Sequence, residues 1–157
     1  MFDFFPNPTR RNAMKALPSL IAALALALGG AAFAHDDATL DKMKAANGGQ
    51  LRAAGAQHYE LVVAPPGSKG EALPVAVYVT DHAGAKVPVA GASGNVTVLS
   101  GGQKATIALQ PAGDNLLKGS GAYVPGHDLK AIVSVTLPGQ PAGQARFEPF
   151  GGGGHSH

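Results

Sequence analysis

Residues 129–137 read LKAIVSVTL, and this stretch decides the fold class. Every second position, from Leu129 through Val133 to Leu137, carries an apolar side chain. Successive side chains of a strand point to opposite faces, so the alternation predicts a β-strand with one buried face.

The same alternation recurs on both sides of this strand. Glycine- and proline-rich turns separate the segments, as in Ser100-Gly101-Gly102-Gln103, and no helical period lies between them. The pattern predicts an all-β fold, an immunoglobulin-like antiparallel β-sandwich of six or seven strands. Besides residues 129–137, the expected strands are 57–63, 75–82, 96–99, 104–109, one within 116–123, and one within 143–150.

The sandwich is expected to occupy residues 56–150. Residues 35–55 are expected to form an N-terminal arm or a short helix, which Asp37 would cap and Asn47-Gly48-Gly49 would stop. Residues 151–157, GGGGHSH, are expected to form a flexible tail.

Residues 1–34 have the features of an export signal that is cleaved after Ala34. Lys15 precedes an alanine- and leucine-rich core, and Ala32-Phe33-Ala34 resembles a signal-peptidase site. Arg10-Arg11 leaves two alternatives: a long twin-arginine signal, or translation from Met14 with an ordinary secretory signal. The apolar part is shorter than the about 20 residues of a membrane span, so we expect a periplasmic protein without a membrane anchor after cleavage.

Composition excludes several classes of function. The chain has no cysteine, which excludes disulfides, thiolate metal sites and thiol catalysis. Loss of residues 1–34 leaves nine basic and nine acidic side chains, and this balance makes nucleic acid or an anionic membrane a poor partner.

Histidine is the abundant ligating group, with six in the chain. After cleavage His35 would offer an amine and an imidazole to one ion, and Asp36 beside it would add an oxygen ligand. His155 and His157 in the tail form a short histidine-rich tract, which is a compositional signal for metal.

Two further histidines fall within predicted strands. His58 and His82 would both point away from the apolar face, His58 with Glu60 on the same face and His82 next to Asp81. We therefore place them among the candidate metal ligands.

Catalytic signatures are lacking. Leu99-Ser100-Gly101-Gly102-Gln103 spells the signature of ATP-binding-cassette ATPases, but it lies between two strands and the chain has no phosphate-binding loop. Gly91-Ala92-Ser93-Gly94 is not a nucleophile elbow. We expect no enzyme activity and no organic cofactor.

A set of motifs resembles one protein family. The set is Gly48-Gly49, His58-Tyr59-Glu60-Leu61-Val62, Val77-Tyr78-Val79-Thr80-Asp81-His82, Leu99-Ser100-Gly101-Gly102, Pro111-Ala112-Gly113-Asp114-Asn115, Val135-Thr136-Leu137-Pro138-Gly139 and Arg146-Phe147. In these motifs the chain resembles small, largely uncharacterised proteobacterial periplasmic proteins found beside heavy-metal efflux and copper-resistance systems. It is also similar to the N-terminal part of some efflux adaptor subunits. The resemblance carries over to His58 and His82, whereas Asn47 stands where such proteins often have histidine.

These observations predict a periplasmic binding protein for a divalent metal ion, Cu(II), Zn(II), Ni(II) or Co(II). It would act as a carrier or buffer in heavy-metal resistance or efflux, with efflux-pump subunits as candidate partners. The alternative is a non-enzymatic envelope module that docks on a pump subunit through its strand edges, with incidental histidines.

Overall fold

The computed structural model describes residues 37–151. The expected signal peptide, His35 and Asp36 lie outside these residues, as do the tail histidines His155 and His157. Within the described part of the chain, no helix is long and apolar enough to span a membrane.

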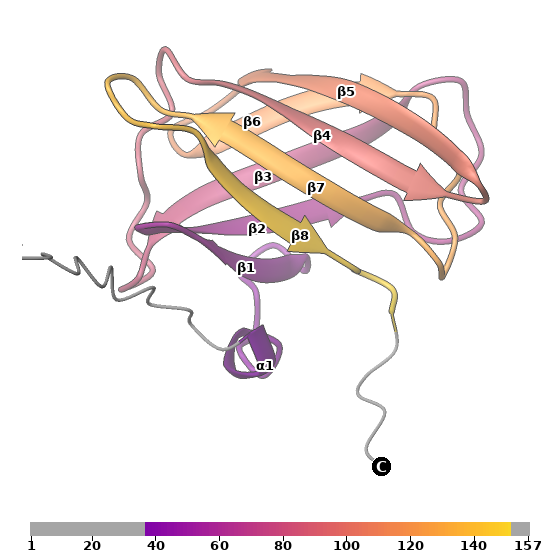
Figure 1. The fold of residues 1–157 in the computed structure, drawn as a ribbon, viewed down its shortest axis with the longest axis horizontal. Coiled ribbons are helices and arrows are strands. Elements are labelled where there is room, and N and C mark those ends of the chain that lie inside the picture. The colour runs from indigo at the N-terminus through magenta and orange to yellow at the C-terminus, as the bar shows by residue number, and fades with distance from the viewer. Residues whose placement is uncertain (1–36, 152–157) are drawn as a thin grey trace, which may run out of the picture. The chain divides into compact units, whose positions relative to one another are not determined.

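Eight antiparallel strands and one helical turn make up the described chain (Figure 1). This confirms the all-β prediction. The elements are α1 (Asp37–Leu40), β1 (Gln50–Ala54), β2 (Gln57–Val63), β3 (Leu73–Asp81), β4 (Ser93–Ser100), β5 (Gln103–Pro111), β6 (Leu116–Gly121), β7 (Lys130–Thr136) and β8 (Gly143–Phe147).

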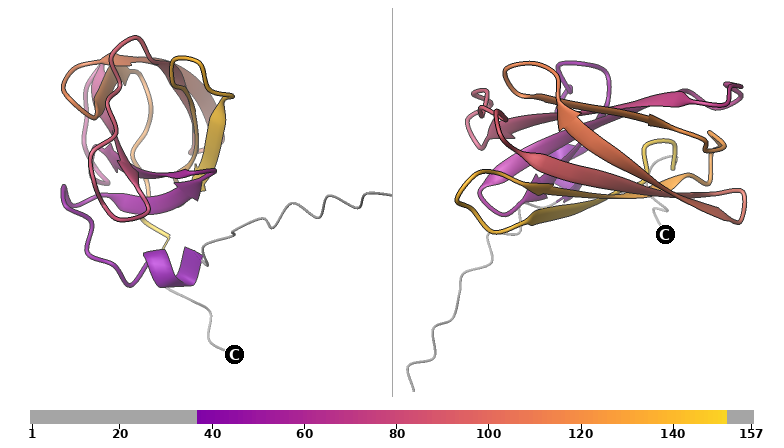
Figure 2. Two further views of the ribbon diagram at one scale, coloured as in Figure 1. Left: turned by 90° about the vertical axis from the view of Figure 1, so that its left-hand side faces the viewer. Right: turned by 90° about the horizontal axis from the view of Figure 1, so that it is seen from above.

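The strands form one nearly closed sheet in the order β1-β2-β3-β6-β5-β4-β7-β8. β5 joins its two halves, since most of β5 pairs with β4 while Gln110 and Pro111 pair with β6. The end strands β1 and β8 lie side by side, so the strands surround a common interior (Figures 1 and 2).

The prediction of a two-layer sandwich with six or seven strands is not confirmed. The additional strand is β1, which lies within residues 35–55, the range expected to form an arm or a short helix. Its sequence QLRAA has no β-branched or aromatic residue, so β-propensity gives little sign of it. Pairing with β2 makes it a strand, from Gln50 opposite Leu61 to Ala54 opposite Gln57.

The interior contains the apolar side chains that the alternation predicts. Val75, Val77 and Val79 of β3 are all buried, and the same holds for the alternating set of residues 129–137. β2 directs Tyr59 and Leu61 into this core, both at most 1% exposed. The position of His58 and Glu60 on the opposite face of β2 follows from this alternation.

Within the described residues the N-terminal helix spans Asp37–Leu40 and ends well before Asn47, where the sequence predicted its stop. Leu40 is buried, whereas Met43 is 52% exposed, so the two do not share a packed face. Asp41 instead forms an ion pair with Arg52 of β1 at 2.7 Å, which holds this turn against the sheet.

Candidate metal site

His58 and His82 come from neighbouring strands. His58 lies on β2 opposite Thr80 of β3, and His82 directly follows β3. His82 is two residues beyond Thr80, so its side chain continues on the face that carries His58. The sequence predicted this common face, but the register between β2 and β3 is what brings the two residues together.

The two imidazoles are in direct contact. His82 Nδ1 and His58 Nε2 are 2.9 Å apart, a hydrogen bond in which one ring donates and the other accepts. The ring centroids are 4.6 Å apart and the planes meet at 89°. His58 is only 5% exposed, whereas His82 is exposed. One ring of the pair is therefore buried and the other is accessible to solvent.

Glu60 lies on the same face as His58 and is 4% exposed, and its carboxylate accepts three hydrogen bonds. Oε1 accepts hydrogen bonds from the backbone N–H groups of Asn47 (2.8 Å) and Gly49 (2.9 Å). Oε2 accepts a third from Asn47 Nδ2 at 2.9 Å. Glu60 therefore anchors the Asn47–Gly49 loop on β2, and these hydrogen bonds use three of the about four acceptor sites of its carboxylate.

Asp81, the carboxylate next to His82 in sequence, also accepts hydrogen bonds from nearby backbone groups. Its Oδ1 accepts hydrogen bonds from the N–H groups of Ala83 (2.9 Å) and Ala85 (2.8 Å). This arrangement closes the turn after β3, where Gly84 has a φ of 82°. Among residues 37–151 no group of three or more histidine, aspartate or glutamate side chains is placed to hold a metal ion.

The structure thus brings together two of the candidate ligands, His58 and His82. The other four, His35, Asp36, His155 and His157, lie outside the described residues. Sequence reasoning missed the role of Glu60, and it treated Asn47-Gly48-Gly49 as a helix stop and as part of the family motif but not as a partner of Glu60. The sequence did carry a signal for this role. Glu60 is an acidic residue on the face of the predicted strand 57–63 that points away from the apolar side chains, and Gly48-Gly49 precedes that strand.

No family model, curated protein or solved structure matches this chain.

Proposed function

We propose that this protein binds a divalent metal ion, Cu(II) or Zn(II) before Ni(II) or Co(II), through His58 and His82. The observation that carries the proposal is the 2.9 Å separation between His58 Nε2 and His82 Nδ1. Imidazole is the usual nitrogen ligand of these metals in proteins.

The separation suits two ligands of one ion. Metal–imidazole bonds of about 2.0–2.1 Å place two ligand nitrogens about 2.9 Å apart at the right angle of a square Cu(II) site and roughly 3.3 Å apart at the tetrahedral angle of Zn(II). The shared proton of the His58–His82 hydrogen bond would then leave as the metal enters, since a ligating nitrogen must be unprotonated. A small rotation of the exposed His82 ring would direct both lone pairs at the ion.

Two imidazoles from the folded domain leave room for further ligands. The N-terminal amine and imidazole of His35 and the carboxylate of Asp36 would supply these after cleavage behind Ala34. A site shared between a folded domain and a terminal segment suits an ion that must be taken up and released. We therefore assign the protein a carrier or buffer role in the periplasm, in support of heavy-metal resistance or efflux, which the family resemblance also favours.

Metal titration of the protein that begins at His35 tests the proposal. Calorimetry with Cu(II), Zn(II), Ni(II) and Co(II) should show at least one ion bound more tightly than about micromolar, or roughly 8 kcal/mol. His82→Ala and His58→Asn should each weaken that binding by about tenfold or more, because each removes a direct ligand. His127→Ala, an exposed loop histidine, is the matched control and should leave the affinity unchanged.

Two results would reject this function. One is the absence of any binding tighter than about micromolar. The other is equal affinity in the parent protein and in a folded His58→Asn/His82→Ala double variant. A second protein that begins at Asp37 separates the contributions, since it keeps the histidine pair and lacks His35 and Asp36.

A further inference from the structure

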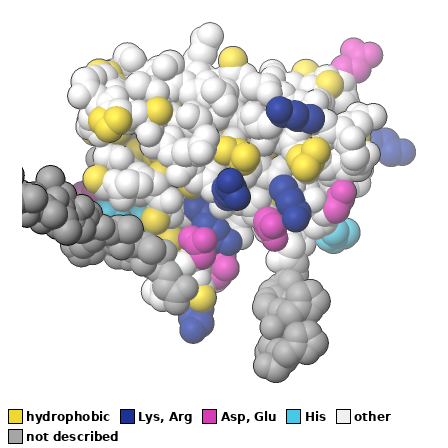
Figure 3. Space-filling model, in the orientation of Figure 1, with side chains coloured by type: hydrophobic (Ala, Val, Ile, Leu, Met, Phe, Trp, Pro, Cys, Tyr) yellow, Lys and Arg dark blue, Asp and Glu magenta, His cyan; other side chains and the backbone are white. Residues whose placement is uncertain are grey.

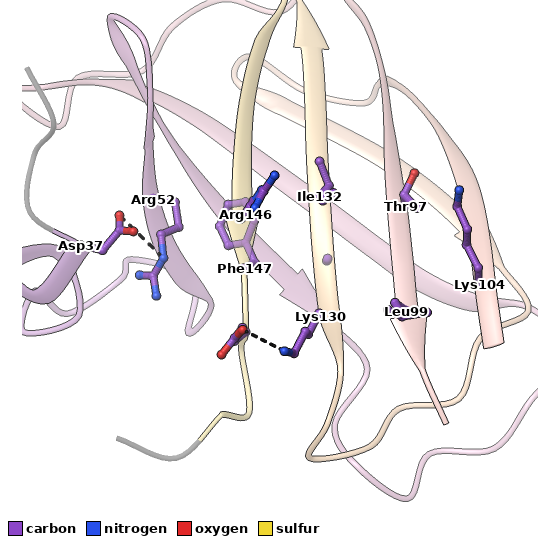
Figure 4. Close-up of a pocket in the computed structure, with 11 residues that line it drawn as sticks. Asp37, Arg52, Thr97, Leu99, Lys104, Lys130, Ile132, Arg146 and Phe147 are labelled. Carbon is purple, nitrogen blue, oxygen red and sulfur yellow. Dashed lines mark ion pairs between the residues drawn. The ribbon is translucent and has the colours of Figure 1, made fainter. Parts of the chain in front are cut away.

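A broad open groove of about 760 Å³ crosses the outer face of β4, β7 and β8 and reaches β1 and α1 (Figure 4). His58 and His82 do not line it. Ligand-sized pockets have volumes of about 300–1,000 Å³, so this groove admits a few side chains of a partner.

The strand register arranges the side chains of the groove in two rows. Leu99 of β4 lies between Lys104 of β5 and Lys130 of β7, with which it is paired directly. In the next row, Ile132 of β7 lies between Thr97 and Arg146. Directly opposed residues on one face of a sheet have Cβ atoms about 4.5–5.5 Å apart, so each apolar side chain has a cationic neighbour.

The centre of the groove is apolar and accessible. Leu99 is 49% exposed and Ile132 is 36% exposed. Most large apolar side chains of the described chain are inside the nearly closed sheet, and these two lie on adjacent strands of one outer face. The space-filling view shows hydrophobic, basic and acidic side chains intermixed on this face (Figure 3).

The lining of the groove has an excess of positive charge, with four cationic side chains against the two carboxylates of Asp37 and Glu148. Lys130 forms an exposed ion pair with Glu148 at 3.5 Å, and Arg52 is paired with Asp37 and Asp41. Within residues 37–151 no carboxylate lies in ion-pair distance of Lys104 or Arg146. The near-zero charge of the expected mature chain therefore conceals a local basic face, which composition did not predict.

We propose that this groove docks an acidic, extended segment of another protein that also carries apolar side chains. Carboxylates of the partner would pair with Lys104 and Arg146, and an apolar side chain between them would cover Leu99 and Ile132. Charge complementarity of this kind sets partner choice and association rate, and the apolar contact supplies the buried area.

Other occupants fit the groove less well. Outside the described residues, the mature chain expected after cleavage carries Asp36 as its one acidic side chain and no large apolar side chain, so these residues do not supply such a segment. Single-stranded nucleic acid would require exposed aromatic side chains for base stacking, and Phe147 beneath the groove is 1% exposed.

The test uses a short fluorescein-labelled peptide of alternating glutamate and leucine, measured by fluorescence anisotropy. The full mature protein should bind it, and binding should weaken as salt rises because exposed charges are screened. A Lys104→Glu/Arg146→Glu variant should bind roughly tenfold or more weakly, since it replaces attraction by repulsion at both cations. Leu99→Ser should also weaken binding, whereas Lys86→Glu/Lys118→Glu, exposed lysines outside the groove, should not.

Control probes distinguish the chemistry. A glutamate–serine peptide and a lysine–leucine peptide should both bind more weakly than the glutamate–leucine peptide. The proposal is overturned if the groove variants bind like the parent protein while their circular dichroism shows a native fold. It is also overturned if phosphatidylglycerol vesicles bind through Lys104 and Arg146 and the peptide does not. Sedimentation that shows a dimer of the parent protein, which the groove variants abolish, would likewise overturn it.

Discussion

Among single residues, Glu60 organises the strand face that carries His58. It is a buried carboxylate whose three hydrogen bonds hold Asn47 and Gly49 against β2. The loop comes so close that a Cβ atom at Gly49 would collide with the carbonyl oxygen of Leu61. Glu60 thus fixes the path of the chain between α1 and β1, on the strand face that carries His58.

Glu60→Gln should destabilise the fold by about 1–3 kcal/mol, because the new amide group would place a donor against the donor Asn47 Nδ2. Urea unfolding followed by circular dichroism measures this cost. Glu71→Gln, at an exposed position, is the control and should leave the free energy of unfolding unchanged. Unchanged stability together with a large loss of metal affinity would show that Glu60 is a ligand and not an anchor.

At the scale of elements, the β4–β5 hairpin depends on a contact from outside its own two strands. Gly101 and Gly102 form its turn with φ values of 57° and 72°, as the sequence predicted. Asp128, which precedes β7, accepts hydrogen bonds from the Gly101 N–H (2.9 Å) and from Ser100 Oγ (3.2 Å). The hydrogen bond from the Gly101 N–H lowers the pKa of Asp128 from its ordinary value of 3.8, and the hydrogen bond from Ser100 lowers it by a smaller amount.

This lowered pKa gives the fold a pH dependence. Since the folded state favours the charged form, the stabilisation is present above the unfolded pKa and is lost as the pH falls through the folded pKa. Asp128→Asn should therefore be less stable than the parent at neutral pH, and the difference should shrink below about pH 4. Thermal unfolding at a series of pH values measures it, and a difference that stays constant down to pH 2 would contradict this account.

For the whole molecule, the decisive feature is the seam where β8 meets β1 and β2. Side chains bridge it, since Gln50 Oε1 accepts a hydrogen bond from the Glu148 N–H at 2.9 Å. Gly143, the first residue of β8, lies against the Tyr59 hydroxyl so closely that no Cβ atom fits. The absence of a side chain at Gly143 lets the sheet approach closure over the core residue Tyr59.

Gly143→Ala should destabilise the protein by about 1–3 kcal/mol, because overpacking a filled site forces neighbouring atoms to move. In a Tyr59→Phe background the same substitution should cost clearly less, since the colliding oxygen is gone. A double-mutant cycle measured by urea unfolding gives this coupling. Equal costs in both backgrounds would show that the Tyr59 hydroxyl does not limit the space at Gly143.

The sequence predicted much of the strand pattern but little of how the strands assemble. The alternation in residues 75–82 and 129–137 identified the buried faces correctly, because side-chain direction repeats every two residues whatever the strand's partner. β1 was missed because its residues lack β-propensity and pairing with β2 creates it. The outer-face position of His58 was predictable, whereas its burial depends on packing that alternation does not encode.

By itself the sequence determined the all-β class, the turns and the common face of His58 and His82. Only the tertiary structure decided the nearly closed sheet, the 2.9 Å contact between the two histidines and the basic groove around Leu99 and Ile132. Local alternation and turn chemistry are properties of neighbouring residues. Contacts between distant residues depend on the register and order of the strands. Register and order are set by the burial of the apolar faces of all strands in one core.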